Sequence, residues 1–219
     1  MPNQPTTPTL QFLILSVCLC FSTILYAQEI DSGLVKQLEQ IHEDDQSLRR
    51  QIDIVQTNYG HDSRQMEELG KKIHKQDSLN LIKVERIIKK HGYPGKSLVG
   101  NEHSSTAFLV IQHSDLATQE KYLPMLKEAA EAGELPYSSL ALLIDRVRMR
   151  HKIPQLYGTQ LYRNPETGNV EFYEILDESC VDQRRKEVGL PPLKEYAKWF
   201  DIKYKRPGKC KKKKEKASN

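Results

Sequence analysis

The stretch Leu140–Gln160, LALLIDRVRMRHKIPQLYGTQ, decides how the second half of this chain folds. Its first part has apolar residues at helical spacing, so we expect a helix over residues 136–151 whose apolar side faces inward. Gln155–Gln160 then ends the helical pattern, and residues that favour strands follow. An Asp or Arg inside such an apolar stretch needs a partner, because a buried unpaired charge is strongly destabilising.

A β-hairpin is expected directly after this stretch. Residues 160–163 and 170–175 are rich in aromatic and β-branched side chains, and they flank the turn sequence NPETGN at 164–169. Two short helices, near residues 180–187 and 192–200, are expected to follow, with a Gly and two Pro residues between them.

The first half of the chain shows the spacing of long amphipathic helices. Apolar residues recur at helical intervals over residues 31–57 and 62–90, which predicts a helical hairpin, and residues 93–100 are expected to form a loop. Residues 104–113 are too continuously apolar for a surface helix and should be buried, while 116–132 predict another helix. The expected fold class is mainly α: a helical hairpin followed by a compact helical domain carrying one small β-hairpin.

The N-terminus indicates export. Residues 10–27 carry no charge and end at the small residue Ala27, as in a secretory signal peptide. The alternative is an uncleaved single-span anchor, because no Lys or Arg precedes the apolar run. We therefore expect a signal peptide over 1–27 and a periplasmic or extracellular mature chain. Within that chain we expect an N-terminal helical segment over 28–74 and a core domain over 75–202.

The charge of the chain is unevenly distributed. The net charge is +4, but nine Lys or Arg and one Glu give residues 203–219 a charge of +8, which leaves −4 for the rest. This distribution argues against a uniformly basic nucleic-acid binder, and no specific nucleic-acid binding is expected. The lysine-rich tail is expected to be disordered and able to contact anionic envelope polymers or lipid.

Two cysteines, Cys180 and Cys210, remain after the expected signal cleavage. In an oxidising compartment they could form one disulfide that holds the basic tail to the body, and the alternative is two free thiols. Their spacing does not suit a zinc site, and neither a metal nor a cofactor is expected.

Three short polar segments, which we call the polar words, interrupt the apolar pattern: Gln112-His113, Asp145-Arg146 and Gln155–Gln160. We expect them to form one shared cluster, which either braces the fold or lines a cleft. In a cleft, His113 would transfer a proton, Asp145 would orient it, and Arg146 would bind an anionic group. Hydrogen bonds to a ligand would then come from Gln112, Gln155, Tyr157, Thr159, Gln160 and Arg184.

Further polar residues could join this cluster. Arg184 or Arg185 could fold back onto Asp145 or a ligand carboxylate, and the alternative is a solvated helix face, especially for Arg185. Asp77 and Asn80 lie one helical turn apart and could face the cluster, or they could serve as caps or face solvent.

The sequence lacks the common catalytic motifs: no GxSxG, GxGxxG, Walker A or HExxH pattern occurs. Our leading hypothesis is an exported envelope protein whose polar cluster braces the fold or binds a small polar ligand. One alternative is a hydrolase- or transferase-like enzyme that uses His113, Asp145 and Arg146. Another is a protein-interaction module that works through the front helices.

Taken in order, these words resemble a bacterial domain family of unknown function whose members are often exported. The resemblance rests on the pattern QH, DR, QxYGTQ and RRxxxGL, the last being Arg184–Leu190, and covers roughly residues 75–200. It implies a real domain in which the polar words belong together, and it implies no activity.

Overall fold

The computed structural model describes residues 30–210 and is mainly helical, with one two-stranded antiparallel hairpin. The expected fold class is confirmed. The expected signal peptide, residues 1–27, and residues 211–219 of the expected tail lie outside the described residues. None of the described helices has the length and apolar character needed to cross a membrane.

Three front helices form a long arm: α1 (Ser32–Arg49), α2 (Ile52–Tyr59) and α3 (Arg64–His91). The Asp31 side chain caps α1 by accepting from the Leu34 amide, and Ser63 caps α3 in the same way. The single helix expected over residues 31–57 is divided at Arg50 and Gln51. Both residues keep right-handed helical backbone angles, so the division is a local distortion and not a chain reversal.

The apolar stripe of α1 is used inside the molecule, where Leu34, Leu38 and Ile41 are buried. On α2, by contrast, Ile54 is 61% and Tyr59 58% exposed. Leu79 and Ile82 of α3 are also about half exposed, so apolar side chains of the arm reach solvent on α2 and on α3.

Residues 96–103, expected in part as a loop, form the short helix α4 (Lys96–His103). Gly100 interrupts it with a φ of 79°, a left-handed conformation that glycine adopts without strain. The two short helical pieces on either side of Gly100 leave too little periodic sequence for the helix to be predicted.

The central helix is α5 (Thr106–His113), which explains the continuous apolar sequence there. Its Val110 packs into one core cluster with α1, α3 and α4, and its Phe108 and Ile111 pack into a second. The second cluster is completed by α6 (Leu116–Glu131) and α7 (Tyr137–Arg150). Because α5 is covered on both sides, it has no solvent-facing stripe.

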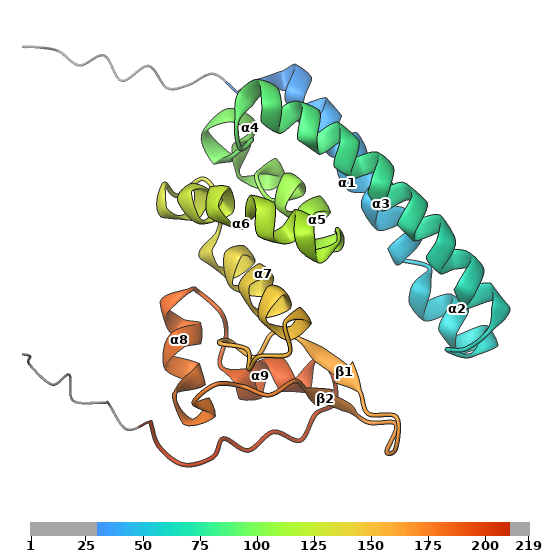
Figure 1. The fold of residues 1–219 in the computed structure, drawn as a ribbon, viewed down its shortest axis with the longest axis vertical. Helices are drawn as coiled ribbons and strands as arrows, with labels where there is room; N and C mark the ends of the chain where they lie inside the picture. The colour runs from blue at the N-terminus through green and yellow to red at the C-terminus, as the bar shows by residue number, and fades with distance from the viewer. Residues whose placement is uncertain (1–29, 211–219) are drawn as a thin grey trace, which may run out of the picture.

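The remaining elements pack below α7 (Figure 1). Strands β1 (Leu161–Arg163) and β2 (Val170–Phe172) form the expected hairpin, in which Leu161 pairs with Phe172. A 3-10 turn (Glu178–Cys180) leads into α8 (Val181–Glu187), and α9 (Leu193–Lys198) ends the regular structure.

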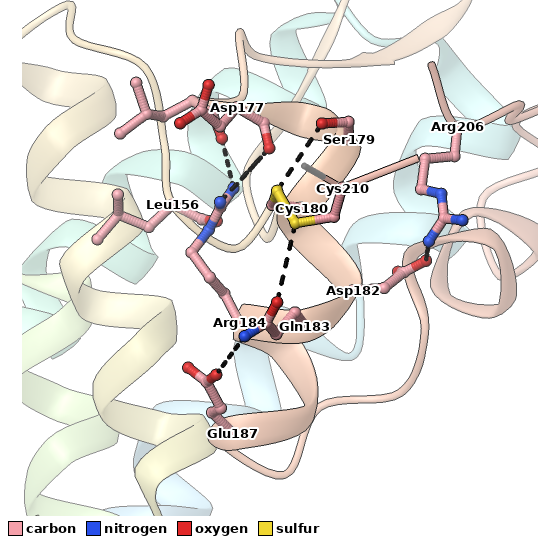
Figure 2. Close-up of a disulfide and its surroundings, with 11 residues drawn as sticks. Leu156, Asp177, Ser179, Cys180, Asp182, Gln183, Arg184, Glu187, Arg206 and Cys210 are labelled. Atoms are coloured by element: carbon pink, nitrogen blue, oxygen red, sulfur yellow. Dashed lines mark hydrogen bonds and ion pairs between the residues drawn. A yellow bond between two sulfur atoms is a disulfide. The ribbon is translucent and has the colours of Figure 1, made fainter. Parts of the chain in front are cut away.

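Residues 203–210 have no regular secondary structure, but they lie along the body. A disulfide joins Cys180 to Cys210, which resolves the choice left open by the sequence (Figure 2). Arg206 also pairs with Asp182 at 3.4 Å, and the Tyr204 ring packs edge-on to Phe172. These contacts fix the part of the expected tail that precedes residue 211.

Candidate functional site

The polar words do not meet in one cluster; they form two. The first surrounds Asp145, whose side chain is fully buried in α7. Its carboxylate accepts from the backbone amides of Leu156, Tyr157 and Thr159 and from the Thr159 hydroxyl, at 2.6–3.1 Å. Burial raises the pKa of Asp145, although these four donors favour its charged form. Asp145 therefore holds the following loop and does not orient His113.

Gln155 and Gln160 close the same loop. The Gln155 amide donates to the carbonyl oxygens of Gln160 and Tyr173 and accepts from the Gln160 N–H at 2.8 Å. Gly158 has a φ of +68°, and a Cβ there would lie 2.8 Å from the Ile175 side chain, so only glycine fits. The segment QLYGTQ thus forms a tight loop whose polar groups pair with one another.

Two arginines of α8 complete this cluster from the other side. Arg184 donates from Nε to the Leu156 carbonyl at 2.7 Å (Figure 2). Arg185 is fully buried, donates to the carbonyls of Tyr157 and Pro191, and lies over the Tyr196 ring at 4.8 Å. The expectation that Arg185 lies on a solvated helix face is wrong. We call this set, Asp145, Gln155, Thr159, Gln160, Arg184 and Arg185, the loop brace.

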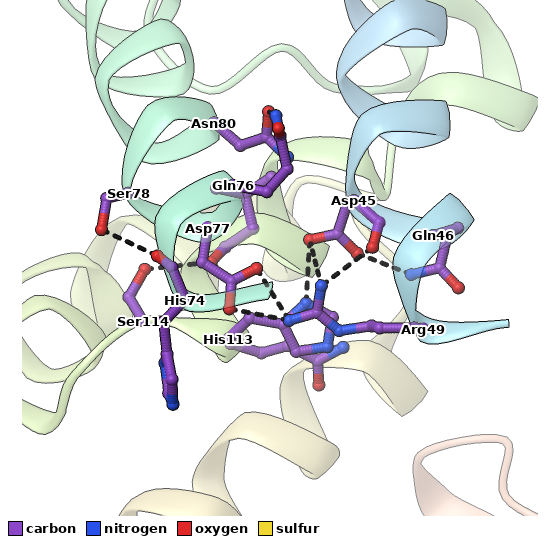
Figure 3. A network of polar contacts seen from close by, with 12 residues as sticks. Asp45, Gln46, Arg49, His74, Gln76, Asp77, Ser78, Asn80, His113 and Ser114 are labelled. Carbon is purple, nitrogen blue, oxygen red and sulfur yellow. Dashed lines mark hydrogen bonds and ion pairs between the residues drawn. The ribbon is translucent and has the colours of Figure 1, made fainter. Parts of the chain in front are cut away.

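The second cluster surrounds His113, at the C-terminal end of α5 (Figure 3). His113 Nδ1 lies 3.0 Å from the carboxylate of Asp45, which is fully buried on α1. Arg49, one turn after Asp45, contacts the Asp45 carboxylate at 3.4 Å and binds both oxygens of Asp77 on α3, at 2.8 and 2.9 Å. Three helices are therefore joined by two carboxylates, one guanidinium and one imidazole.

The charge state of Asp45 determines which ring nitrogen of His113 carries a proton. Burial alone would raise the pKa of Asp45, but the hydrogen bond and charge of His113, with the charge of Arg49, outweigh it and hold that pKa below its ordinary value. An ionised carboxylate only accepts, so His113 Nδ1 carries a proton and donates it. Asp45 thus has the orienting role that the sequence analysis gave to Asp145.

The other ring nitrogen of His113, Nε2, has no hydrogen-bond partner within residues 30–210, and it is not among the buried unpaired atoms. A shallow pocket of about 230 Å³ lies beside the ring. Besides His113, the lining residues are His74, Asp77, Ser78, Leu81, Ser114 and Asp115. An imidazole held at Nδ1 by a carboxylate, with Nε2 open, can take up or release a proton.

Arg146 follows Asp145 but belongs to neither set of pairs. Its Nε is buried and has no acceptor among the described residues. Burial lowers the pKa of Arg146, and the charges of Arg150 and Arg49 lower it further. Gln112 is also buried, and its Oε1 has no partner in the same region of the chain. Arg146 is thus a half-buried cation whose Nε has no acceptor among residues 30–210.

Asp45, Asp77 and His113 could hold a metal ion, because one ligand atom of each lies within 4.8 Å of the others. Two carboxylates and an imidazole are a common ligand set for divalent transition metals. The Arg49 guanidinium, however, contacts both carboxylates (Figure 3). A metal ion would have to displace it, so Arg49 already supplies the compensating positive charge.

Asp45 and Arg49 were not predicted from the sequence, although the pattern of α1 contains a signal for Asp45. Leu34, Leu38, Ile41 and Asp45 follow one another at helical spacing, so Asp45 falls on the buried stripe of α1. Of the two further candidates, Asp77 joins the cluster through Arg49. Asn80 is fully buried one turn later, and its Oδ1 accepts from Gln76.

A family model for a family of unknown function, DUF6624, matches residues 32–208. The chain belongs to this family. The match includes the front helices, so the family extends beyond the residues 75–200 over which the resemblance was recognised. Both the loop brace and the His113 cluster therefore lie inside the DUF6624 region. Comparison with curated proteins and with solved structures gives no match.

Proposed function

We propose that this DUF6624 protein is an exported domain that binds a small anionic ligand at Arg146 and His113. Export to the periplasm or the cell surface is supported by the apolar sequence that ends at Ala27 and by the Cys180–Cys210 disulfide, which suits an oxidising compartment.

The observation that carries the ligand proposal is Arg146. A buried guanidinium N–H normally donates to a carboxylate or a carbonyl group, as the Nε and Nη1 of Arg185 do in the same molecule, although its Nη2 has no partner among residues 30–210. Arg146 has a buried Nε without an acceptor among residues 30–210. An anion with two or more oxygen atoms would supply the missing acceptor and a counter-charge for the guanidinium.

The helix that carries Arg146 packs against the helix that carries His113. Arg49, His113 and Arg146 stand near the C-terminal ends of α1, α5 and α7, and α5 packs against both other helices. Helix C-termini favour positive charge, which accounts for several basic residues here. This general preference for positive charge does not provide the hydrogen-bond acceptor that the buried Nε–H of Arg146 requires.

The test compares two arginines of α7. Arg146→Met should leave the free energy of unfolding unchanged or raise it, because an unpaired buried charge is removed. Arg148 donates to the Pro154 carbonyl at 2.7 Å, so Arg148→Met should cost about 1–3 kcal/mol. Binding of phosphate, sulfate, acetate and citrate would be measured by calorimetry, with glucose as the neutral control.

At least one anion should bind the wild-type chain and the Arg148 variant, and should fail to bind the Arg146 variant. If no anion binds, or if Arg146→Met destabilises the fold as much as Arg148→Met, Arg146 is a structural residue and the proposal is wrong.

A second candidate, acid–base catalysis on the bound anion, is favoured by one observation: His113 Nε2 is open while Asp45 holds Nδ1. Carboxylic and phosphoric esters would be screened with wild type, His113→Gln and Asp45→Asn. An enzyme should lose turnover in both variants and keep anion affinity in His113→Gln. Turnover that persists in His113→Gln would exclude this role.

A further inference from the structure

The end of α9 presents two neighbouring aromatic residues to solvent. Trp199 is 69% and Phe200 38% exposed. Both rings contact Tyr196 edge-on, with centroid distances of 5.3 and 5.1 Å, so they are supported from below. Trp199 is the most exposed large apolar side chain within residues 30–210. Two adjacent exposed rings form a contiguous apolar surface, and such surfaces can mark contact sites.

Exposed basic residues surround this pair on α9 and on the segment that follows it: Lys194, Lys198, Lys203, Lys205, Arg206 and Lys209. Only Glu195 and Asp201 oppose them within residues 194–210. Counting on to residue 219, eleven basic and three acidic residues give +8, which leaves −4 for residues 1–193 of a chain with net charge +4. The positive charge is therefore concentrated at the C-terminal end of the sequence.

A disulfide and an ion pair hold the segment that follows α9 to the body of the protein. Cys210 is bonded to Cys180 at the start of α8, and Arg206 pairs with Asp182 (Figure 2). Lys194 and Lys198 of α9 line one surface depression together with Tyr204 and Arg206. Tyr204 and Arg206 are thus held beside α9.

We propose that Trp199, Phe200 and these basic residues form a peripheral contact with an anionic lipid surface. Each Lys or Arg close to such a surface contributes about 1 kcal/mol of attraction, which falls off within a Debye length. Indole rings prefer the zone between head groups and acyl chains, so Trp199 would enter that zone while the lysines contact the head groups.

A lipid surface fits this arrangement better than a soluble polyanion. Charge alone would attract either partner, but a polyanion gives no reason for an exposed apolar ring. A single-stranded nucleic acid could stack its bases on the ring, and it remains the rival to be tested. Export, which belongs to the proposed function, would separate the protein from nucleic acid. The anion site at Arg146 is independent of this surface.

The test uses residues 28–219, which contain every element of the described fold, and vesicles of phosphatidylcholine with or without phosphatidylglycerol. Trp199 is the only tryptophan of the chain, so its emission reports on this one position. We expect co-sedimentation with the anionic vesicles, a blue shift of the emission, and release by high salt. Neutral vesicles should give none of these.

Two variants distinguish binding through the Trp199 surface from nonspecific binding to vesicles. Trp199→Ala should lower the vesicle partition coefficient about tenfold, corresponding to about 1.4 kcal/mol. Tyr137→Ala, which removes an aromatic that is 45% exposed on α7, should leave it unchanged.

The proposal is overturned if anionic vesicles do not bind. It is also overturned if they bind without a blue shift and equally well to Trp199→Ala, which would indicate attraction by charge alone. Tighter binding to a single-stranded oligonucleotide than to vesicles, with quenched Trp199 emission, would identify a nucleic-acid surface instead. None of these results bears on Arg146, so the proposed function is tested separately.

Discussion

Replacing Asp145 by Asn should destabilise the fold nearly as much as replacing it by Ala. The carboxylate accepts from four donors, and each of its two oxygens is used. Asparagine has the same shape but only one oxygen, and its NH₂ group would face N–H groups that also need acceptors.

The size of the effect follows from this geometry. One amide oxygen can keep about two of the four donors, so about two remain buried and unpaired at about 1–3 kcal/mol each. We therefore expect Asp145→Asn to cost about 3–5 kcal/mol, a large part of the ~5–15 kcal/mol that stabilises a typical domain. With a urea slope of ~2 kcal/mol per molar, the unfolding midpoint should fall by about 2 M.

Urea unfolding followed by circular dichroism measures this directly. The matched control is Asp115→Asn, which changes a carboxylate that accepts one backbone N–H at the exposed start of α6. Asparagine caps helices as well as aspartate does, so the urea midpoint of this variant should not move. If Asp145→Asn unfolds within about 1 kcal/mol of wild type, the loop brace does not depend on the carboxylate and our reasoning fails.

Two further predictions concern the other polar contacts. Because the pKa of Asp45 is lowered from 3.8 in the folded state, its ionisation stabilises the fold above that pH and loses this effect as the pH falls through the folded pKa. Asp45→Asn should therefore lower the free energy of unfolding by about 3 kcal/mol near neutral pH. Urea titrations should show this difference between wild type and variant shrinking below about pH 4. A difference that stays constant with pH would contradict the ion-pair account. The Cys180–Cys210 disulfide closes a loop with a sequence separation of 30, so Cys180→Ser should lower stability by up to about 3–4 kcal/mol, measured by thermal unfolding. Adding a reducing agent should lower the melting temperature of wild type and leave that of the variant unchanged; equal melting temperatures before reduction would argue that the bond does not form.

The helices and the hairpin were predictable because each depends on local pattern. The stripe Leu34, Leu38 and Ile41 repeats at helical spacing, and the turn at 164–169 has the residues that turns require. Helix α4 was not predictable, because Gly100 divides it into pieces that show no periodicity. The continuous apolar run at 104–113 was correctly expected to be buried, and α5 is covered on both sides.

The partners within the site depended on contacts that the sequence does not encode locally. His113 bonds with a residue 68 positions earlier, and Asp145 bonds with a loop 11–14 positions later. Both were identified as buried polar residues in need of partners, but only the packing of α1 on α5 decides which carboxylate reaches the imidazole. The burial of Arg185 depends in the same way on where α8 packs.

The loop at residues 155–160 is held through its main chain and through the side chains of Gln155, Thr159 and Gln160. Asp145 binds its amides, and Arg184 and Arg185 bind its carbonyl groups. The Tyr157 side chain is left free to line an apolar pocket of about 290 Å³ between α6 and α7. A substitution at position 157 would therefore change the shape and polarity of that pocket without removing support from the loop. In an evolving or engineered chain, this position could acquire new chemistry while the backbone beneath it keeps its place.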